Sequence, residues 1–318
     1  MLRKMTDEQM AVMESAGGSG TKKTKWSQLP LHLMILPGLL LIIVYSYGPM
    51  LGSMIAFQDF NPARGIFDSE WNGLDNFRYV MDLPGTFQVV WNTLIIAVMK
   101  IVVGLIVPIA VALLLNEVRK ELFKRTIQTM VYLPHFLSWI ILGGVLIDIL
   151  SPSQGIVNQM LNGLGIDSIY FLGSNEWFRS VLVVSDVWKE FGFNTIVYLA
   201  ALTSINPSLY EAAVIDGANR WKQTLYVTLP GMAPIIILTA TLALGQVLNA
   251  GFDQVFNLYS PQVYDTGDII DTFVYRIGIV DAQYGVATAV GLFKSVVSLI
   301  LLSVSYILAY RFANYRIF

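Results

Sequence analysis

Six stretches of this 318-residue chain are each long and apolar enough to cross a lipid bilayer. A transmembrane helix needs about 20 predominantly apolar residues. The fourth stretch is the most polar of the six, because it includes Asp186, Lys189 and Glu190. The sequence therefore predicts an all-α polytopic membrane bundle of six transmembrane helices. The six predicted spans cover residues 31–57, 86–115, 126–150, 180–204, 231–256 and 285–312.

The composition agrees with a chain that lies largely in lipid. Hydrophobic residues make up 55% of it and charged residues 13%, whereas a soluble domain has about a quarter charged residues. The net charge of -2 provides no basic surface for a nucleic acid. Cysteine is absent, and His32 and His135 have no companion at the spacing of metal ligands. We expect membrane lipid as the surroundings, no nucleic-acid partner, and no metal or cofactor in this chain.

Lysine and arginine are distributed unevenly between the two sides of the predicted bundle. These residues accumulate in the cytoplasmic segments of membrane proteins. One side has thirteen of them and the other has four, which predicts that both termini are cytoplasmic. The thirteen are Arg3, Lys4, Lys22, Lys23, Lys25, Arg119, Lys120, Lys124, Arg125, Arg220, Lys222, Arg311 and Arg316; the four are Arg64, Arg78, Arg179 and Arg276.

The first thirty residues differ from the rest of the chain. They are polar, and a Gly-Gly-Ser-Gly run precedes a cluster of lysines. The apolar run that follows is too long for the hydrophobic region of a signal peptide and lacks a small-residue cleavage site. We predict a flexible cytoplasmic tail over residues 1–30 and a transmembrane domain over 31–318.

The connection between the fourth and fifth spans, residues 205–230, combines helix signals with a sharp turn. Pro207 suits the first turn of a helix, and Ser208 followed by Glu211 predicts a capping box. Gly217 predicts an exit from that helix through a left-handed turn. A second short helix is then expected before a proline opens the fifth span. By the charge asymmetry, this whole segment faces the cytoplasm.

The same segment contains a motif with fixed spacing. Glu-Ala-Ala at 211–213 is followed after three residues by Gly217, and after nine more by Val-x-Leu-Pro at 227–230. This pattern resembles the cytoplasmic signature of binding-protein-dependent ABC importer permeases, with valine in place of the family's isoleucine. Asp216, Ala218 and Trp221 resemble its sugar-importer version. The resemblance implies a coupling helix held in a cleft of an ATPase subunit, with the coupling residues Glu211, Ala212, Ala213, Asp216, Gly217, Ala218, Trp221, Leu229 and Pro230.

The likeness extends over nearly the whole chain after the tail. Segments 71–77, 92–94 and 252–258 also resemble the permeases of oligosaccharide or polysaccharide-fragment importers. A purely local role is the alternative for the signature: Glu211 would only cap its helix and Gly217 would only end it. The spacing, the six spans and the inward-facing position favour the signature.

The resemblance implies a complete transport assembly around this chain. It implies the type I permease architecture of ABC importers in the bacterial cytoplasmic membrane, and a midplane cavity. The expected partners are a second, homologous permease, two cytoplasmic ATPase subunits that bind ATP and Mg, an external solute-binding protein, and a carbohydrate.

The chain itself has no nucleotide-binding signature. No Gly-x-x-x-x-Gly-Lys-Ser/Thr sequence occurs, so a phosphate-cradling loop of that kind is absent and ATP hydrolysis is expected in a partner chain. Three alternatives stay open: an ion-coupled carrier, a permease for a solute other than a sugar, and a membrane scaffold. The carrier is suggested by embedded charges, which usually mark a transport pathway. These charges are Lys100, Asp148, Asp186, Lys189, Asp253 and Lys294.

Polar residues within the predicted spans are candidates for the lining of a solute pathway. An ionisable group in lipid is costly unless it is paired or faces water. Trp139 and Trp188 are further candidates for stacking on sugar rings. Two simpler explanations compete: Asp186 and Lys189 pair with each other, or the tryptophans mark the membrane interface. The predicted pathway residues are Asp186, Trp188, Lys189, Asn194, Asn249, Asp253, Gln254 and Lys294.

Overall fold

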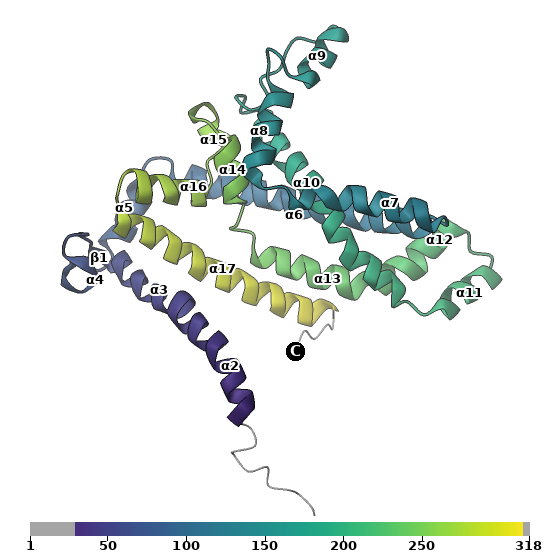
Figure 1. Ribbon diagram of the computed structural model, residues 1–318, viewed down its shortest axis with the longest axis horizontal. Helices are drawn as coiled ribbons and strands as arrows, with labels where there is room; N and C mark the ends of the chain where they lie inside the picture. Colours follow the sequence, from purple (N-terminus) through teal and green to yellow (C-terminus); the bar gives the residue numbers. More distant parts are fainter. Residues whose placement is uncertain (1–28, 314–318) are drawn as a thin grey trace, which may run out of the picture. The chain divides into compact units, whose positions relative to one another are not determined.

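A computed structural model describes residues 29–313 of the chain (Figure 1). The predicted cytoplasmic tail lies almost entirely outside these residues. The chain divides between Ser53 and Met54 into two compact units, each of which is described by itself. By length and composition, four helices of the described residues could cross a membrane, or five if one bent pair counts as a span. These helices are His32–Phe57, Thr86–Glu117, Arg220–Gly245 and Tyr284–Ile307, and the bent pair is Glu121–Phe136 with Trp139–Leu150.

The N-terminal unit consists of the first apolar helix, as predicted. Its side chains are exposed on all sides; Met34, for example, is 80% exposed. A helix that is apolar all round is typical of a membrane span. The helix changes to a π-helical turn just before Pro49, which lacks the backbone N–H needed to continue a regular ladder. The elements are α2 (Leu29–Ile42), η2 (Ile43–Tyr47), α3 (Gly48–Met50) and the start of η3 (Leu51–Phe57).

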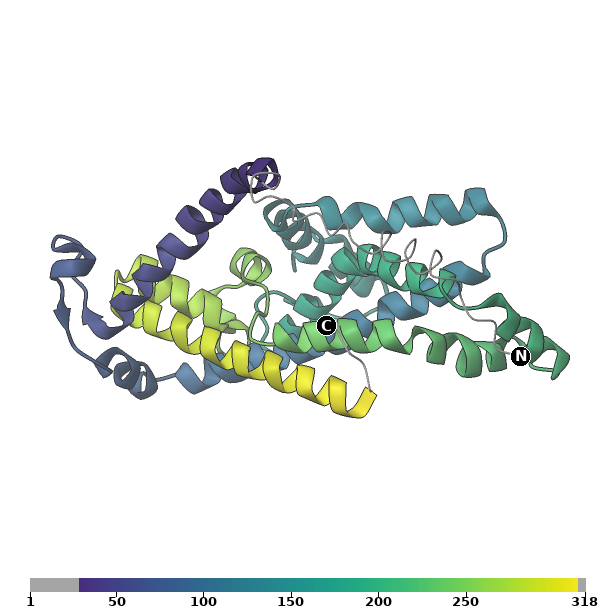
Figure 2. The ribbon, with the colours of Figure 1, turned by 90° about the horizontal axis from the view of Figure 1, so that it is seen from below.

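The larger unit is built on four long helices. α6 packs along α10, and α13 packs along α17, as both side views show (Figures 1 and 2). α10 is 26 residues long, so it measures about 39 Å at 1.5 Å per residue and matches the fourth predicted span in length. Because it contains charged residues, α10 is not among the four helices whose composition is apolar enough to cross a membrane. The four helices are α6 (Thr86–Glu117), α10 (Phe178–Thr203), α13 (Leu229–Gly245) and α17 (Tyr284–Ala313).

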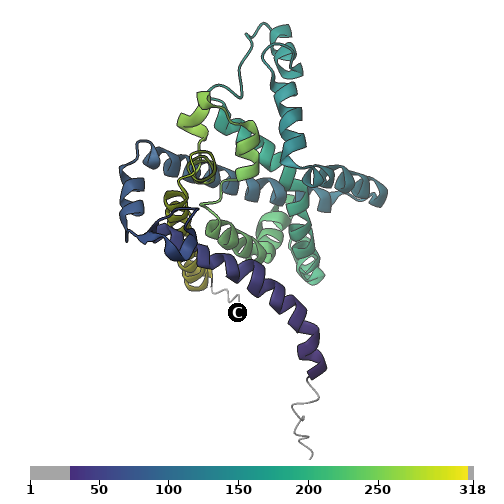
Figure 3. The same ribbon diagram turned by 60° about the vertical axis from the view of Figure 1, so that its left-hand side comes forward.

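The third predicted span is a bent pair of helices, and it counts as a span only if the two helices are taken together. α7 (Glu121–Tyr132) and η4 (Leu133–Phe136) are followed by α8 (Trp139–Leu150), and the chain bends by 101° between them (Figure 3). Pro134 prevents a regular helical ladder at this point. The Ser138 hydroxyl then accepts a hydrogen bond from the Ile141 amide and starts the new helix. The bend brings α8 against α14 (Phe252–Leu258).

The fifth predicted span also has different limits. It begins at Arg220 and runs through α12 (Arg220–Gln223), η5 (Thr224–Thr228) and α13 without interruption. The predicted separate short helix is therefore the first part of the span. A π-helical turn at η5 accommodates Pro230 in the continuous helix. α13 ends at Gly245, and residues 246–251 are not helical before α14 begins.

Shorter elements complete the larger unit, and all of them except α11 lie outside residues 205–230. β1 (Gln58–Asp59) pairs antiparallel with β2 (Glu70–Trp71), with Gln58 opposite Trp71 and Asp59 opposite Glu70. The other elements are α4 (Gly65–Asp68), α5 (Asp75–Asp82), α9 (Ile156–Gly163), α11 (Pro207–Ile215), η6 (Pro261–Val263), α15 (Tyr264–Gly267), α16 (Ile270–Tyr275) and η7 (Arg276–Val280). The all-α class is confirmed, whereas the count of six spans and the cytoplasmic side of the termini stay predictions.

Two separate hydrophobic cores hold the larger unit together. The first joins α6, α10, α14, α16 and α17, with Phe178, Leu182, Val255 and Ile269 among its fully buried side chains. The second joins α6, α10 and α13 around Met232, close to residues 205–210. The two cores occupy opposite ends of α6 and α10, which leaves the middle of these helices for other contacts.

Gly192 permits a close approach between α10 and α7. A Cβ atom at this position would overlap the backbone carbonyl of Val131 in α7. We expect Gly192→Ala to destabilise the protein by about 1–3 kcal/mol, because overpacked backbone contacts relax poorly. Gly104→Ala is the matched control, since nothing lies within 4 Å of a Cβ there. Thermal unfolding in detergent would measure both; equal midpoints would contradict the prediction.

Candidate functional site

α11, the short helix that follows α10, begins with an N-cap at Asn206. The Asn206 Oδ1 atom accepts a hydrogen bond of 3.0 Å from the Ser208 amide, and Pro207 occupies the first turn. The predicted capping box of Ser208 and Glu211 is wrong, because asparagine one position before the proline already satisfies the helix end. Glu211 is left exposed on the helix surface.

Gly217 ends α11 through the predicted left-handed turn. Its φ angle is +75°, a conformation that costs residues with a Cβ atom about 1–2 kcal/mol. The Gly217 amide donates to the Val214 carbonyl, and the Ala218 amide donates to the Ala213 carbonyl at 2.8 Å. These bonds satisfy carbonyls at the end of the helix. The Asn219 side chain then caps the next helix by accepting from the Lys222 amide at 2.9 Å.

Side-chain contacts fix this helix–turn–helix segment to the second core. The Tyr210 hydroxyl lies 3.0 Å from the Thr228 hydroxyl, which joins α11 to η5. The side-chain amide of Gln223 donates a hydrogen bond of 2.9 Å to the Ala218 carbonyl, which stabilises the turn. Tyr210 also packs against the second core, together with Val227. A displacement of α11 would therefore be passed to α10 and α13.

The outer surface of the segment is apolar and unusually exposed. Ile215 is 85% exposed, Tyr226 76% and Trp221 68%. Three large apolar side chains this exposed within twelve residues make the segment a candidate contact surface. Among the predicted coupling residues, Glu211, Ala212, Asp216, Gly217, Trp221 and Pro230 are exposed, and Ala213, Ala218 and Leu229 are half-buried.

A cavity of about 360 Å³ lies between the two cores. Its wall is formed by the middle of α6, by α10, by the end of α13 and by the non-helical residues 246–251. Irregular backbone at membrane depth is tolerated only where it is buried in protein or lines a cavity. Its lining residues are Ala97, Lys100, Ile101, Gly104, Leu105, Asp186, Val187, Glu190, Phe191, Asn194, Val197, Tyr198, Thr239, Ala243, Gln246, Asn249, Ala250 and Gly251.

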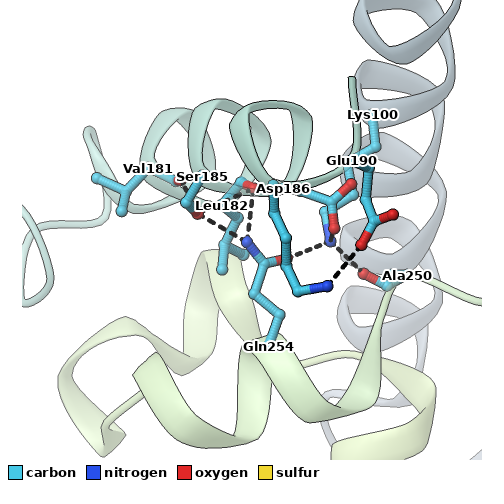
Figure 4. Close-up of polar contacts among 9 residues, drawn as sticks. Lys100, Val181, Leu182, Ser185, Asp186, Glu190, Ala250 and Gln254 are labelled. Atoms are coloured by element: carbon cyan, nitrogen blue, oxygen red, sulfur yellow. Dashed lines mark hydrogen bonds and ion pairs between the residues drawn. The ribbon is translucent and has the colours of Figure 1, made fainter. Parts of the chain in front are cut away.

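Lys100 joins three segments at one end of this cavity (Figure 4). Its ammonium group donates 2.7 Å to the Ala250 carbonyl, donates to Gln254 Oε1, and lies 3.3 Å from Asp186 Oδ1. The Gln254 amide in turn donates to the Leu182 carbonyl at 2.7 Å. The Lys100 side chain is only 10% exposed, so its charge depends on these partners. Lys100 thus holds the break between α13 and α14 against α6 and α10.

Glu190 is the second carboxylate that lines the cavity, and two side chains that do not line the cavity hold it in place. Lys189 Nζ lies 2.7 Å from Glu190 Oε1, and His135 Nδ1 lies 2.7 Å from Glu190 Oε2. Lys189 also donates 2.9 Å to the His135 carbonyl. His135 stacks on Phe193 at 4.0 Å. These contacts fix the bend before α8 to α10. The alternative in which Asp186 pairs with Lys189 does not hold, because Asp186 pairs with Lys100 and Lys189 with Glu190.

The structure brings some of the predicted pathway residues together and separates others. Asp186, Asn194 and Asn249 line the cavity, and Gln254 supports it through Lys100. Trp188 faces an apolar pocket on another side of α10, and Lys189 lies behind Glu190. Asp253 is exposed on α14 and does not line the cavity. Lys294 forms an ion pair of 2.5 Å with Asp271 between α17 and α16.

Glu190 and Gln246 were missed as lining residues, and Lys100 was noted only as an embedded charge. Helical spacing could have identified Glu190, because it lies four residues after Asp186 and four before Asn194, on the same face. Gln246 carries no such signal, since its place depends on where α13 ends. Within residues 29–313, no group of three or more histidines, cysteines or carboxylates is arranged to hold a metal ion.

A comparison with protein families matches most of the chain to a single family. A family model described as "Binding-protein-dependent transport system inner membrane component" matches residues 100–314. The polygalacturonan/rhamnogalacturonan transport system permease protein YteP of Bacillus subtilis is 41% identical over 91% of this chain and 90% of its own length. Protein LplB of the same organism is 40% identical over 93% and 92%.

Solved structures resemble the chain over nearly its full length. One is a crystal structure of a bacterial ABC transporter involved in the import of the acidic polysaccharide alginate, with a TM-score of 0.84 and 39% identity over 90% of this chain and 96% of the other. A second is the bacterial alginate ABC transporter in complex with alginate pentasaccharide-bound periplasmic protein. Its TM-score is 0.86, with 37% identity over 93% of this chain and 99% of the other.

Proposed function

The chain belongs to the family of binding-protein-dependent transport system inner membrane components, and on that premise we propose that it is the permease subunit of an importer for acidic oligosaccharides. It is the membrane-spanning transport subunit of an ATP-driven ABC importer rather than its ATPase. The substrate class is supported by relatives near 40% identity, which are named for the transport of polygalacturonan and rhamnogalacturonan or of alginate. All three are acidic polysaccharides.

One structural observation carries the mechanism. The exposed apolar residues of α11 and α12 and the cavity belong to the same compact unit, and α10 and α13 connect them. ATP and Mg would be bound by two partner ATPase subunits. Their closure would move α11, and the second core would pass this movement to the cavity wall. Rigid-body movement of this kind is a common way to switch between two states.

The size of the cavity supports a second permease subunit. A volume of about 360 Å³ is at the low end of the roughly 300–1,000 Å³ that ligand sites occupy. An oligosaccharide of several rings needs more space, which a companion permease would provide by facing this wall. An external solute-binding protein would deliver the sugar at the end of the bundle opposite α11.

Uptake by reconstituted vesicles tests this proposal. The chain, its companion permease, the ATPase and the binding protein are reconstituted together, and ATP is enclosed. We expect ATP-dependent uptake of galacturonate or alginate oligosaccharides and little uptake of neutral maltose oligosaccharides of equal length. Uptake of neither class would contradict the proposed substrate. Uptake by this chain alone under an ion gradient would favour the carrier instead.

The apolar surface of the coupling segment gives a direct test of ATPase docking. We expect Ile215→Asp to abolish co-purification of the ATPase, because an 85% exposed apolar contact becomes a buried charge in the complex. Ile166→Asp, at an exposed isoleucine after α9, is the matched control and should leave the complex intact. Pull-down from detergent-solubilised membranes measures both. Full recovery of the ATPase with the Ile215 variant would contradict docking at this surface.

A further inference from the structure

A row of five aromatic rings leads away from the cavity, toward the end of the molecule opposite α11. α14 contributes Phe252 and Phe256, the turn after it contributes Tyr259, and α15 and α16 contribute Tyr264 and Tyr275. We propose that this row, here called the aromatic track, is a binding surface on which the rings of an oligosaccharide stack as it enters or leaves the cavity. The inference rests on the proposed function and extends it to a specific surface.

The rings are in contact from one end of the track to the other. Phe252 stacks on Phe256 with centroids 5.2 Å apart, and Tyr275 lies across both at 5.7 and 4.9 Å. Phe256 is 6.2 Å from Tyr259, which is 5.3 Å from Tyr264. Each step is within the 4.5–7 Å that is typical of aromatic pairs. The track therefore has no gap that a sugar ring would have to cross.

The track is on the open side of α14. Gln254, Val255 and Leu258 are buried on the opposite side, where they meet α10 and the first core. Phe252 and Phe256, at i and i+4, share the other face. Phe256 is 38% exposed, and the remaining four rings are half-buried, so part of each ring is accessible. The buried side fixes the helix, and the rings are left available for a ligand.

The inner end of the track is next to the cavity lining in the chain. Gly251 lines the cavity and is followed in the chain by Phe252. At the outer end, the Arg276 guanidinium lies over Tyr264 at 4.6 Å and forms a 2.5 Å ion pair with Asp268. A ligand on the track would pass from the neighbourhood of the Arg276–Asp268 ion pair to the cavity wall that includes Asn249.

The chemistry of the track fits a sugar better than lipid. Three of the five rings are tyrosines, and Asp253 is exposed on the same helix, whereas a charged side chain facing lipid is costly. Burial, followed by the nearby Tyr264, raises the pKa of the Tyr259 phenol to about 12, so this group stays neutral at physiological pH. Neutral aromatic faces attract the C–H faces of sugar rings, and phenol hydroxyls can hydrogen-bond to sugar hydroxyls without repelling a carboxylate.

A comparison of flat and branched side chains tests the proposal. In the complete reconstituted importer, Phe256→Leu and Tyr275→Leu keep apolar bulk but remove the ring, whereas Phe256→Trp and Tyr275→Phe retain a ring. We expect the leucine variants to lose about two- to tenfold of pentasaccharide uptake, with a smaller loss for the disaccharide, and the ring-retaining variants to stay near wild type. Phe123→Leu, at an exposed phenylalanine of α7 far from the cavity, is the matched control.

Three outcomes would contradict the proposal that the aromatic track binds sugar rings. Equal uptake by all variants would show that the rings do not contact sugar. Equal losses for short and long sugars would indicate a packing role. Loss of the companion permease on purification would mean that the rings form the subunit interface. If the wild-type importer takes up no acidic oligosaccharide, the proposed function fails instead; the wild-type assay distinguishes that failure from failure of the track.

Discussion

Replacing Gly217 with proline is expected to reduce substrate uptake by about a hundredfold while the protein still inserts into the membrane. Proline fixes φ near −65°, whereas Gly217 has a φ of +75°, and the substitution also removes the amide that donates to Val214. A misplaced proline costs about 3 kcal/mol or more, which corresponds to roughly a hundredfold in a coupled equilibrium. The turn between α11 and α12 would have to refold, and α11 would no longer be held in its present orientation.

Gly217→Asn is the matched control for this variant. Asparagine adopts the left-handed region more readily than other residues with a Cβ atom, and no atom lies within 4 Å of a Cβ at this position. We expect the asparagine variant to retain most of its uptake. Uptake and ATPase activity are measured on the same reconstituted complex, and insertion is checked by membrane fractionation. A correctly inserted proline variant with normal uptake would contradict a coupling role for the turn.

Lys100→Met is expected to have the largest effect on stability. The substitution leaves the Ala250 carbonyl, Gln254 Oε1 and the Asp186 carboxylate without their shared donor. Removing one partner of a buried ion pair typically costs about 3–5 kcal/mol. Since residues 246–251 are then no longer held to α6, we also expect uptake to be lost. Thermal unfolding in detergent and uptake in vesicles measure the two effects.

A second substitution separates the expected loss of stability from the expected loss of uptake. Lys100→Met combined with Asp186→Asn removes the unpaired carboxylate, so we expect the double variant to regain part of the lost stability but not the uptake. Coupling between neighbouring residues makes such effects non-additive. Lys120→Met, at an exposed lysine between α6 and α7, is the control for loss of one positive charge. An unchanged unfolding midpoint for Lys100→Met would contradict the bracing role.

The sequence was most informative where a single segment determines its own structure. The apolar length of α6 and α17, the glycine turn at 217 and the proline at the start of α11 all follow from local rules. These predictions agree with the structure. The motif spacing likewise identified the family before any helix was placed, because residues 211–230 form one continuous segment.

Predictions were less successful where distant segments decide the outcome. Asp186 and Lys189 have the spacing of a helical pair, yet Asp186 turns to Lys100 and Lys189 to Glu190, because α6 and the bend before α8 offer closer partners. The end of α13 at Gly245 also depends on a distant part of the sequence, since residues 246–251 are held by Lys100 from another helix. The pattern along one helix contains no information about such partners.

The presence of two cores on either side of the cavity affects how easily the site can change width. Side chains in a close-packed interior resist rearrangement, so a space cut into one continuous core could open only by disturbing that packing. Here α13 belongs to the second core and contributes no side chain to the first, so a movement of α13 need not disturb the packing of the first core. The polar bonds of Lys100 hold residues 246–251, which follow α13, to α6 and α10, so part of the work of opening falls on these bonds. A change at Lys100 would therefore alter the movement of this wall and the stability of the protein together.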